Sequence, residues 1–241
     1  RSMGENINEK FPRIKPYSDS GLLVEFENTI SMEVNSKVVA LYETIKNLDF
    51  NEVIEMIPTY RSLGILYDSK KIDYEDFKEK IQNIANEIVP KENAEKTVIK
   101  IPVLYSDEYG IDLDTVASNA KLTKEEVISI HTSTDYYIYM MGFMPGFAYL
   151  GGLDERIHTP RLENPRTKIY AGSVGIADSQ TGIYPLESPG GWQIIGRTPL
   201  KLYDKDSKDP ILLKAGTYIR FIPIDKGEYE KIEKENSIWE L

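Results

Sequence analysis

The residues best suited to chemistry gather in a glycine- and proline-rich stretch between Gly142 and Pro199. This stretch holds ten of the sixteen glycines, six of the thirteen prolines and four of the eight arginines. In the segments HTPR and NPR, Arg161 and Arg166 each follow a proline, whose fixed φ lowers the cost of ordering the next side chain. A guanidinium is a planar fork that matches a carboxylate or a phosphate. The stretch therefore predicts a pocket for a small anion, built from loops.

Other side chains in this stretch could complete such a pocket. Trp192 offers a flat apolar wall, and the glycines let backbone N–H groups approach a ligand closely. Directed hydrogen bonds could come from Ser173, Gln180, Thr181 and Gln193. His158 could move protons, because an unperturbed imidazole titrates close to neutral pH. Arg197 is expected to hold a ligand carboxylate, since the flanking GGW and TP turns should expose it.

Each of these residues also has a purely structural interpretation. The arginines could pair with nearby acidic residues, which are Asp154, Glu155 and Glu163. Trp192 could belong to the core, and His158 could be a hydrogen-bonded structural residue. His131 lies near the end of a predicted helix, where the helix dipole favours a partly charged imidazole, and a structural role is preferred for it. The clustering nevertheless favours a site, because a structural domain has no need to gather its arginines and an indole in one stretch.

The composition excludes several kinds of partner and site. The formal net charge is −10, so nucleic acid and anionic lipid are poor partners. With two histidines and no cysteine, neither a disulfide nor a zinc site is expected. The sequence has no Walker loop, GxGxxG turn, GxSxG elbow or HExxH pair. No apolar run reaches the roughly 20 residues of a membrane helix, and a cytoplasmic protein is predicted.

The first third of the chain alternates between strand and helix patterns. Apolar residues at helical spacing predict amphipathic helices over 33–47 and 73–88, and Asp73 is a suitable N-cap for the second. Short apolar runs predict strands over 22–27, 52–58 and 63–68. This order is typical of a small ferredoxin-like α+β domain, which is expected over residues 10–91. The polar segment 90–97 opens with a proline and is expected to be a linker.

A second domain is expected over residues 97–241. Its predicted helices cover 112–120 and 123–130, and Thr123 with Glu126 forms a capping box at the start of the second. Further patterns predict strands over 97–105 and 136–143, one or two late strands over 212–224, and a terminal helix over 228–241. Between them, short strands joined by tight turns favour a small β-barrel.

Several of these segments resemble one protein family. They are GFMPGFAYLGGL over 142–153, HTPR over 158–161 and NPRTKIYAGSVGIADSQTGIYPLESPGGWQIIGRTPL over 164–200. They closely resemble the family known variously as the B subunit of 5-oxoprolinase, sporulation-kinase inhibitor and allophanate hydrolase subunit 1. YGIDLDTVA over 109–117 and EEVISIHTS over 125–133 are similar to it as well. The resemblance covers the chain from about residue 10.

The resemblance implies a fold, a reaction and partners. The implied fold is a small α+β domain followed by a cyclophilin-like β-barrel domain. The implied reaction is the ATP-dependent opening of 5-oxo-L-proline to L-glutamate. It implies a hetero-oligomer of this chain with a homologous barrel subunit of the C type and a third 5-oxoprolinase subunit of the A type. ATP is used by that complex, and this chain is expected to bind a small carboxylate, to carry no metal or biotin, and to be inactive alone.

Residue roles can be transferred only where the motifs match. On that basis, His158 and Arg197 are the expected catalytic residues. The expected substrate-binding residues are Arg161, Arg166, Gln180, Tyr184, Trp192 and Gln193. Trp192, Gln193 and Arg197 are expected to project into one shared site. Tyr170 departs from the family pattern, in which a proline is expected at this position, but removes no candidate ligand.

Two other functions remain open on the sequence. In one, the chain is a regulatory protein that binds and inhibits a sporulation histidine kinase without turnover. The polar pocket argues against it, because docking on a helix needs an exposed apolar patch. In the other, the chain is an allophanate hydrolase or urea carboxylase-type subunit, which requires a partner that carries biotin.

Overall fold

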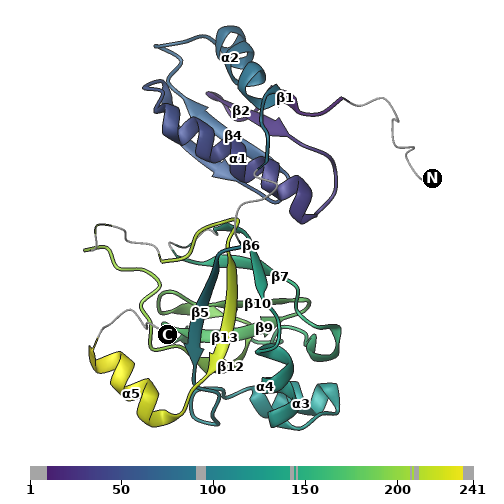
Figure 1. Cartoon of the computed structure of the whole chain (residues 1–241), viewed down its shortest axis with the longest axis vertical. Coiled ribbons are helices and arrows are strands. Elements are labelled where there is room, and N and C mark those ends of the chain that lie inside the picture. The colour runs from purple at the N-terminus through teal and green to yellow at the C-terminus, as the bar shows by residue number, and fades with distance from the viewer. Residues whose placement is uncertain are drawn as a thin grey trace, which may run out of the picture. The chain divides into compact units, whose positions relative to one another are not determined.

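The computed structural model of the chain describes residues 10–90, 96–141, 144, 146–206, 208 and 212–235. The chain divides into two compact units, residues 1–94 and 95–241, and each unit has its own hydrophobic core (Figure 1). Most of the predicted linker over 90–97 lies outside the described residues. In the part of the chain that the structure describes, no helix is both long and apolar enough to cross a membrane.

The first unit is one antiparallel sheet with two helices. In chain order its elements are β1 (Arg13–Pro16), β2 (Gly21–Glu25), α1 (Met32–Leu48), β3 (Val53–Pro58), β4 (Ser62–Tyr67) and α2 (Tyr74–Asn86). The strand order in the sheet is β1-β2-β4-β3. Ser31 caps α1 by accepting from Val34 N, and Asp73 caps α2 by accepting from Asp76 N. The predicted helices are therefore confirmed to within two residues at each end.

The core of the first unit explains why both helices lie on one face of this sheet. Leu22 pairs with Ile65 and Val24 pairs with Leu63, and all four side chains are fully buried. Alternate residues of a strand point to the same face, so these four form one apolar surface. The apolar sides of α1 and α2 join them in a single cluster, and Figure 1 shows α1 lying along the strands.

Strand β1 was not expected from the sequence. Its four residues, RIKP, carry two charges and a proline and have little apolar character. The strand pairs antiparallel with β2. Arg13 and Lys15 both contact the Glu25 carboxylate, at 2.6 and 2.8 Å. Glu25 is 3% exposed, and its two partners hold its pKa below the ordinary value although burial alone would raise it. Charge pairing therefore attaches this edge strand, and an apolar pattern could not reveal it.

The second unit is a mixed α/β structure. It begins with β5 (Val98–Val103), α3 (Leu113–Ala120), α4 (Lys124–His131), β6 (Tyr136–Met141), β7 (Ala148–Gly151) and a 3-10 turn, η1 (Glu155–Ile157). Five short strands follow: β8 (Arg166–Ile169), β9 (Ser173–Ala177), β10 (Gln180–Ile183), β11 (Ser188–Gly190) and β12 (Gln193–Arg197). The unit ends with β13 (Tyr218–Pro223) and α5 (Lys226–Glu235), and the predicted remainder of the terminal helix lies outside the described residues.

The strands of the second unit form three sheets. Their orders are β5-β13-β6-β7, β10-β9-β12 and β11-β8. Within the described residues these sheets are not joined into a closed barrel, so the expected barrel is not seen as continuous strand pairing. Strand β13 lies parallel to β5, which places residues 218–223 beside residues 98–103 (Figure 1). Only 218–223 of the predicted strand region 212–224 is strand.

Candidate functional site

The HTPR segment is hydrogen-bonded to the residues that follow β9 and precede β12. Asp178 N donates to the carbonyl oxygen of Thr159 at 2.7 Å, and Leu162 N donates to that of Gly191 at 2.7 Å. Two backbone hydrogen bonds to distant parts of the chain thus fix both ends of residues 159–162. The structure thereby brings the HTPR and GGWQ motifs together.

Gln193 adds a side-chain contact to this arrangement. Its Nε2 donates to the carbonyl oxygen of Pro160 at 3.0 Å, and the residue is 6% exposed. Its Oε1 is buried and accepts no hydrogen bond in the described part of the chain. Buried polar atoms normally have a partner, so this oxygen is an exception. Through its Nε2, Gln193 positions the HTPR backbone.

Arg161 is the exposed member of the same group. Its guanidinium carbon lies 5.7 Å from the centre of the Trp192 ring, and its Nε lies 3.4 Å from Oδ2 of Asp178. The Arg161 and Asp178 side chains are 54% and 64% exposed, and ion pairs this exposed contribute little. The guanidinium can therefore exchange Asp178 for the carboxylate or phosphate of a ligand.

Trp192 and Tyr184 lie in a small aromatic core beneath Arg161. They are 6% and 5% exposed, and the two rings meet edge to face at 6.1 Å. Phe147 contacts both rings in the same geometry. Because both rings are almost fully buried, they mainly support the site from below. Trp192 therefore acts largely as a core residue, which is its structural interpretation. Gln180 begins β10, opposite Ala177, and is half-buried.

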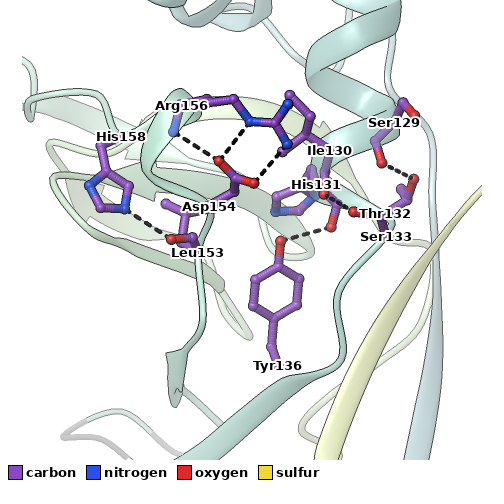
Figure 2. A network of polar contacts seen from close by, with 10 residues as sticks. All are labelled: Ser129, Ile130, His131, Thr132, Ser133, Tyr136, Leu153, Asp154, Arg156 and His158. Atoms are coloured by element: carbon purple, nitrogen blue, oxygen red, sulfur yellow. Dashed lines mark hydrogen bonds and ion pairs between the residues drawn. The ribbon is translucent and has the colours of Figure 1, made fainter.

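His158 follows η1 and is held through one ring nitrogen. Its Nε2 lies 3.0 Å from the Leu153 carbonyl oxygen, toward which the ring points in Figure 2. A carbonyl oxygen only accepts, so Nε2 carries the proton and Nδ1 is the acceptor of the neutral ring. Asn119 Nδ2 donates to the carbonyl oxygen of His158 at 3.1 Å and holds the backbone. An oriented ring with a defined acceptor nitrogen meets the geometric requirement for a general base.

Arg166 is engaged by a carboxylate that the sequence analysis did not single out. Its two terminal nitrogens donate to Asp112 at 2.6 and 2.7 Å, as a bidentate pair. Oδ2 of Asp112 also accepts from Ile194 N at 2.7 Å. Asp112 can approach β12 so closely because position 110 is glycine: a Cβ on Gly110 would overlap the carbonyl of Ile195. Arg166 thus ties β8 to the start of α3 and to β12.

Arg197 lies apart from the other candidates. It ends β12, whereas Gln193 begins it, and four residues of extended chain span roughly 13 Å. The Arg197 guanidinium carbon lies 4.3 Å from the centre of the Tyr109 ring and 4.7 Å from that of Tyr170. The expected single site for Trp192, Gln193 and Arg197 is therefore divided between the two ends of one strand.

The helix-dipole interpretation of His131 is wrong. The residue does end α4, but it is fully buried, and its ring stacks on Phe221 at 4.6 Å. Its Nδ1 lies 2.6 Å from the Tyr105 hydroxyl and its Nε2 lies 2.8 Å from the Thr181 hydroxyl. Thr181 donates its own hydrogen to the Gly175 carbonyl at 2.9 Å, so it must accept from His131 Nε2, and Tyr105 must donate to Nδ1. Burial lowers the pKa of His131 to about 3, and the ring is neutral.

We expect this neutral histidine to make the second unit sensitive to acid. Unfolding restores the pKa of His131 to about 6.5, so the unfolded chain binds a proton that the folded chain refuses between pH 6.5 and about 3. This contribution to stability is complete above pH 6.5 and falls as the pH falls. Its loss between about pH 7.5 and 5 should be about 2 kcal/mol, measured by urea unfolding.

A His131→Gln variant should lose this part of the pH dependence, whatever its stability at neutral pH. Imidazole ¹⁵N shifts of the unaltered protein provide a second measurement. A His131 ring that became protonated near pH 6 in the folded protein would contradict the assignment.

The sequence analysis missed three residues that now stand next to candidate site residues. Asp112 holds Arg166, Tyr109 stacks on Arg197, and Tyr229 packs on Tyr109 with ring centres 4.9 Å apart. Tyr109 and Asp112 lie in the YGIDLDTVA segment, which served only to support the resemblance, and Tyr229 lies in the terminal helix. No group of three or more potential metal ligands occurs among the residues that the structure describes.

Comparisons with known proteins agree on one family. The family model of the carboxyltransferase domain, subdomain C and D, matches residues 12–213. The B subunit of 5-oxoprolinase from Bacillus subtilis (strain 168) is 39% identical over 235 residues, which cover 93% of this chain and 98% of that protein.

Two solved structures are also similar. A conserved uncharacterized protein from Pyrococcus horikoshii is 44% identical, with a TM-score of 0.54, over 90% of this chain and all of that one. The urea carboxylase of Kluyveromyces lactis matches 92% of this chain and 22% of its own, with a TM-score of 0.70. At 22% identity, this second likeness shows a shared fold and nothing further.

Proposed function

The chain belongs to the family of the carboxyltransferase domain, subdomain C and D, and from that premise we propose that it is the B-type subunit of an ATP-dependent 5-oxoprolinase. The observation that carries the proposal is the 39% identity with a 5-oxoprolinase B subunit over almost the whole length of both chains. The reaction would open the lactam of 5-oxo-L-proline to L-glutamate, with ATP consumed by the complex.

The proposed roles follow from the geometry around β12. His158, with its acceptor Nδ1, would move a proton, and Arg161 beside Trp192 would bind an anionic group. Gln193 would position Arg161 through the carbonyl oxygen of Pro160. Gln180 and Tyr184 would support the same region. Arg197 would bind the substrate carboxylate, whereas Arg166 would act by positioning β8 and β12 through Asp112.

The proposal includes partner subunits. A homologous barrel subunit of the C type and a third subunit of the A type would complete the enzyme, which we place in the cytoplasm. This chain alone lacks a Walker loop, which supports a nucleotide site on another subunit. We also propose that residues 10–91 and 97–241 are the two domains of the family.

We propose relationships to known folds for the two domains. The sheet order β1-β2-β4-β3 corresponds to a ferredoxin-like sheet in which an N-terminal strand takes the place of the usual last strand. The three sheets of the second domain would be parts of a cyclophilin-like barrel.

The test is glutamate release from 5-oxo-L-proline and ATP by the assembled candidate subunits. Glutamate should appear in the full mixture and disappear when this chain is omitted. Each subunit is first shown to be folded by circular dichroism. A full mixture of folded subunits that releases no glutamate would overturn the proposal, and a biotin-carrying partner would then be tested for urea carboxylation.

A further inference from the structure

Arg197 is fixed through both its backbone and its side chain. Its backbone forms two hydrogen bonds with Leu104, at 2.9 and 3.1 Å, so the end of β12 is fixed against the segment after β5. Tyr109 and Tyr170 pack against its guanidinium at 4.3 and 4.7 Å. Aromatic packing leaves the edge of the guanidinium, where the N–H groups lie, as the route by which a ligand can approach.

The charge of Arg197 is not balanced by a carboxylate. The other arginines of the second unit have carboxylate partners, which are Asp154 for Arg156, Asp178 for Arg161, Asp112 for Arg166 and Asp135 for Arg220. Within the described residues, Arg197 forms no such ion pair, and its Nε is buried without an acceptor. The Tyr229 hydroxyl is hydrogen-bonded to the Arg197 side chain but is neutral, so an anion would supply the counter-charge that the described residues do not.

Tyr229 adds a second donor from α5. The side chain is buried, and its ring packs on Tyr109. Burial raises the pKa of Tyr229 to about 12 although the Arg197 charge opposes this rise, so the phenol keeps its hydrogen at neutral pH. A guanidinium edge and a phenol O–H together match an anion that accepts two or more hydrogen bonds.

Tyr170 is the exposed aromatic residue beside Arg197. Tyr170 is 51% exposed, and Nζ of Lys168 lies 4.7 Å from the centre of its ring. The ring therefore extends from the half-buried Arg197 to solvent, beside a second cation.

We propose that Arg197, Tyr109, Tyr170 and Tyr229 form a carboxylate-binding site that works on this chain alone, without its partner subunits. The planar carboxylate of a small cyclic acid binds in the plane of the guanidinium, beside the Tyr109 and Tyr170 rings, and accepts from Arg197 and Tyr229. The site lies at the other end of β12 from the HTPR group. It rests on the proposed function only for the choice of carboxylate, which is that of 5-oxo-L-proline.

The experiment is an NMR titration of the ¹⁵N-labelled full chain, observed at the arginine Nε–H resonances. The Arg197 signal is identified by its loss in Arg197→Lys. We expect 5-oxo-L-proline to shift this signal and 2-pyrrolidinone, which lacks the carboxylate, to leave it unchanged. Arg197→Lys should raise the dissociation constant at least about tenfold, because it removes the two-pronged guanidinium. Tyr229→Phe should raise it about threefold, because it removes the phenol O–H donor. Arg220→Lys, which alters an exposed ion pair, is the matched control.

Three results would overturn the inference: no shift with 5-oxo-L-proline, an equal shift with 2-pyrrolidinone, or equal weakening by Arg220→Lys. Circular dichroism of each variant separates lost binding from lost folding. The NMR titration measures binding to this chain and does not depend on turnover by the assembled complex. Binding at Arg197 without glutamate release by the complex would refute the proposed function and leave the site standing. Glutamate release without carboxylate binding at Arg197 would refute the site and leave the proposed function standing.

Discussion

Replacing Asp112 by alanine is expected to lower the free energy of unfolding of the second unit by about 3 kcal/mol. Asp112 is 5% exposed and accepts three hydrogen bonds, two from Arg166 and one from Ile194 N. Its removal leaves a partly buried guanidinium and a buried backbone N–H without acceptors. Urea unfolding can be followed by tryptophan fluorescence, because both tryptophans belong to residues 95–241.

Asp107→Ala is the matched control for this prediction. Asp107 pairs with Lys124 at 2.9 Å, but its side chain is 76% exposed, so its loss should cost less than about 1 kcal/mol. A second variant that combines Asp112→Ala with Arg166→Met removes both charges and should recover about 1 kcal/mol or more. If Asp112→Ala lowered the free energy of unfolding no more than Asp107→Ala, the Asp112–Arg166 pair would not hold β8, α3 and β12 together.

His158→Gln is expected to lower kcat of the assembled complex about 100-fold or more, with little change in stability. The glutamine amide can still donate to the Leu153 carbonyl, which preserves the contact that Nε2 makes. It has no titratable nitrogen to replace Nδ1 and cannot accept a proton from the reacting group. The measurement is glutamate release by the assembled complex across pH 5.5 to 9.

Arg156→Gln serves as the control for the His158 variant. Arg156 lies in the same turn but pairs with Asp154 at the surface, with a side chain that is 64% exposed (Figure 2). Its replacement should leave kcat and the pH profile unchanged. A His158→Gln complex with the kcat and pH profile of the unaltered complex would remove His158 from the mechanism.

Local sequence signals predicted the helices well. Asp73 and Thr123 accept the hydrogen bonds expected of them as N-caps, and each helix begins at the following residue. These signals are reliable because a cap acts within three residues of itself. Strand β1 and the three-sheet arrangement of the second unit had no such signal, since strand pairing joins residues far apart in sequence.

The candidate site was predictable only as a set of residues. The motifs HTPR and GGWQ stand out by composition, and they do meet in the structure through Gln193 and Pro160. The motifs do not show which arginine is available to a ligand. Arg161 and Arg166 both follow a proline, yet one is exposed beside Trp192 and the other is held by a carboxylate 54 residues away.

By itself, then, the sequence determined the helices, the acidic and cysteine-free character of the chain, and the stretch that carries its chemistry. Those properties depend on composition and on neighbours a few residues apart. Tertiary structure alone decided that Asp112 neutralises Arg166, that His131 is buried and neutral, and that Arg197 packs against Tyr109 and Tyr170. Charge and hydrogen bonding act over a few ångströms in space, and the distances that matter are set only when strands and helices distant in sequence pack together.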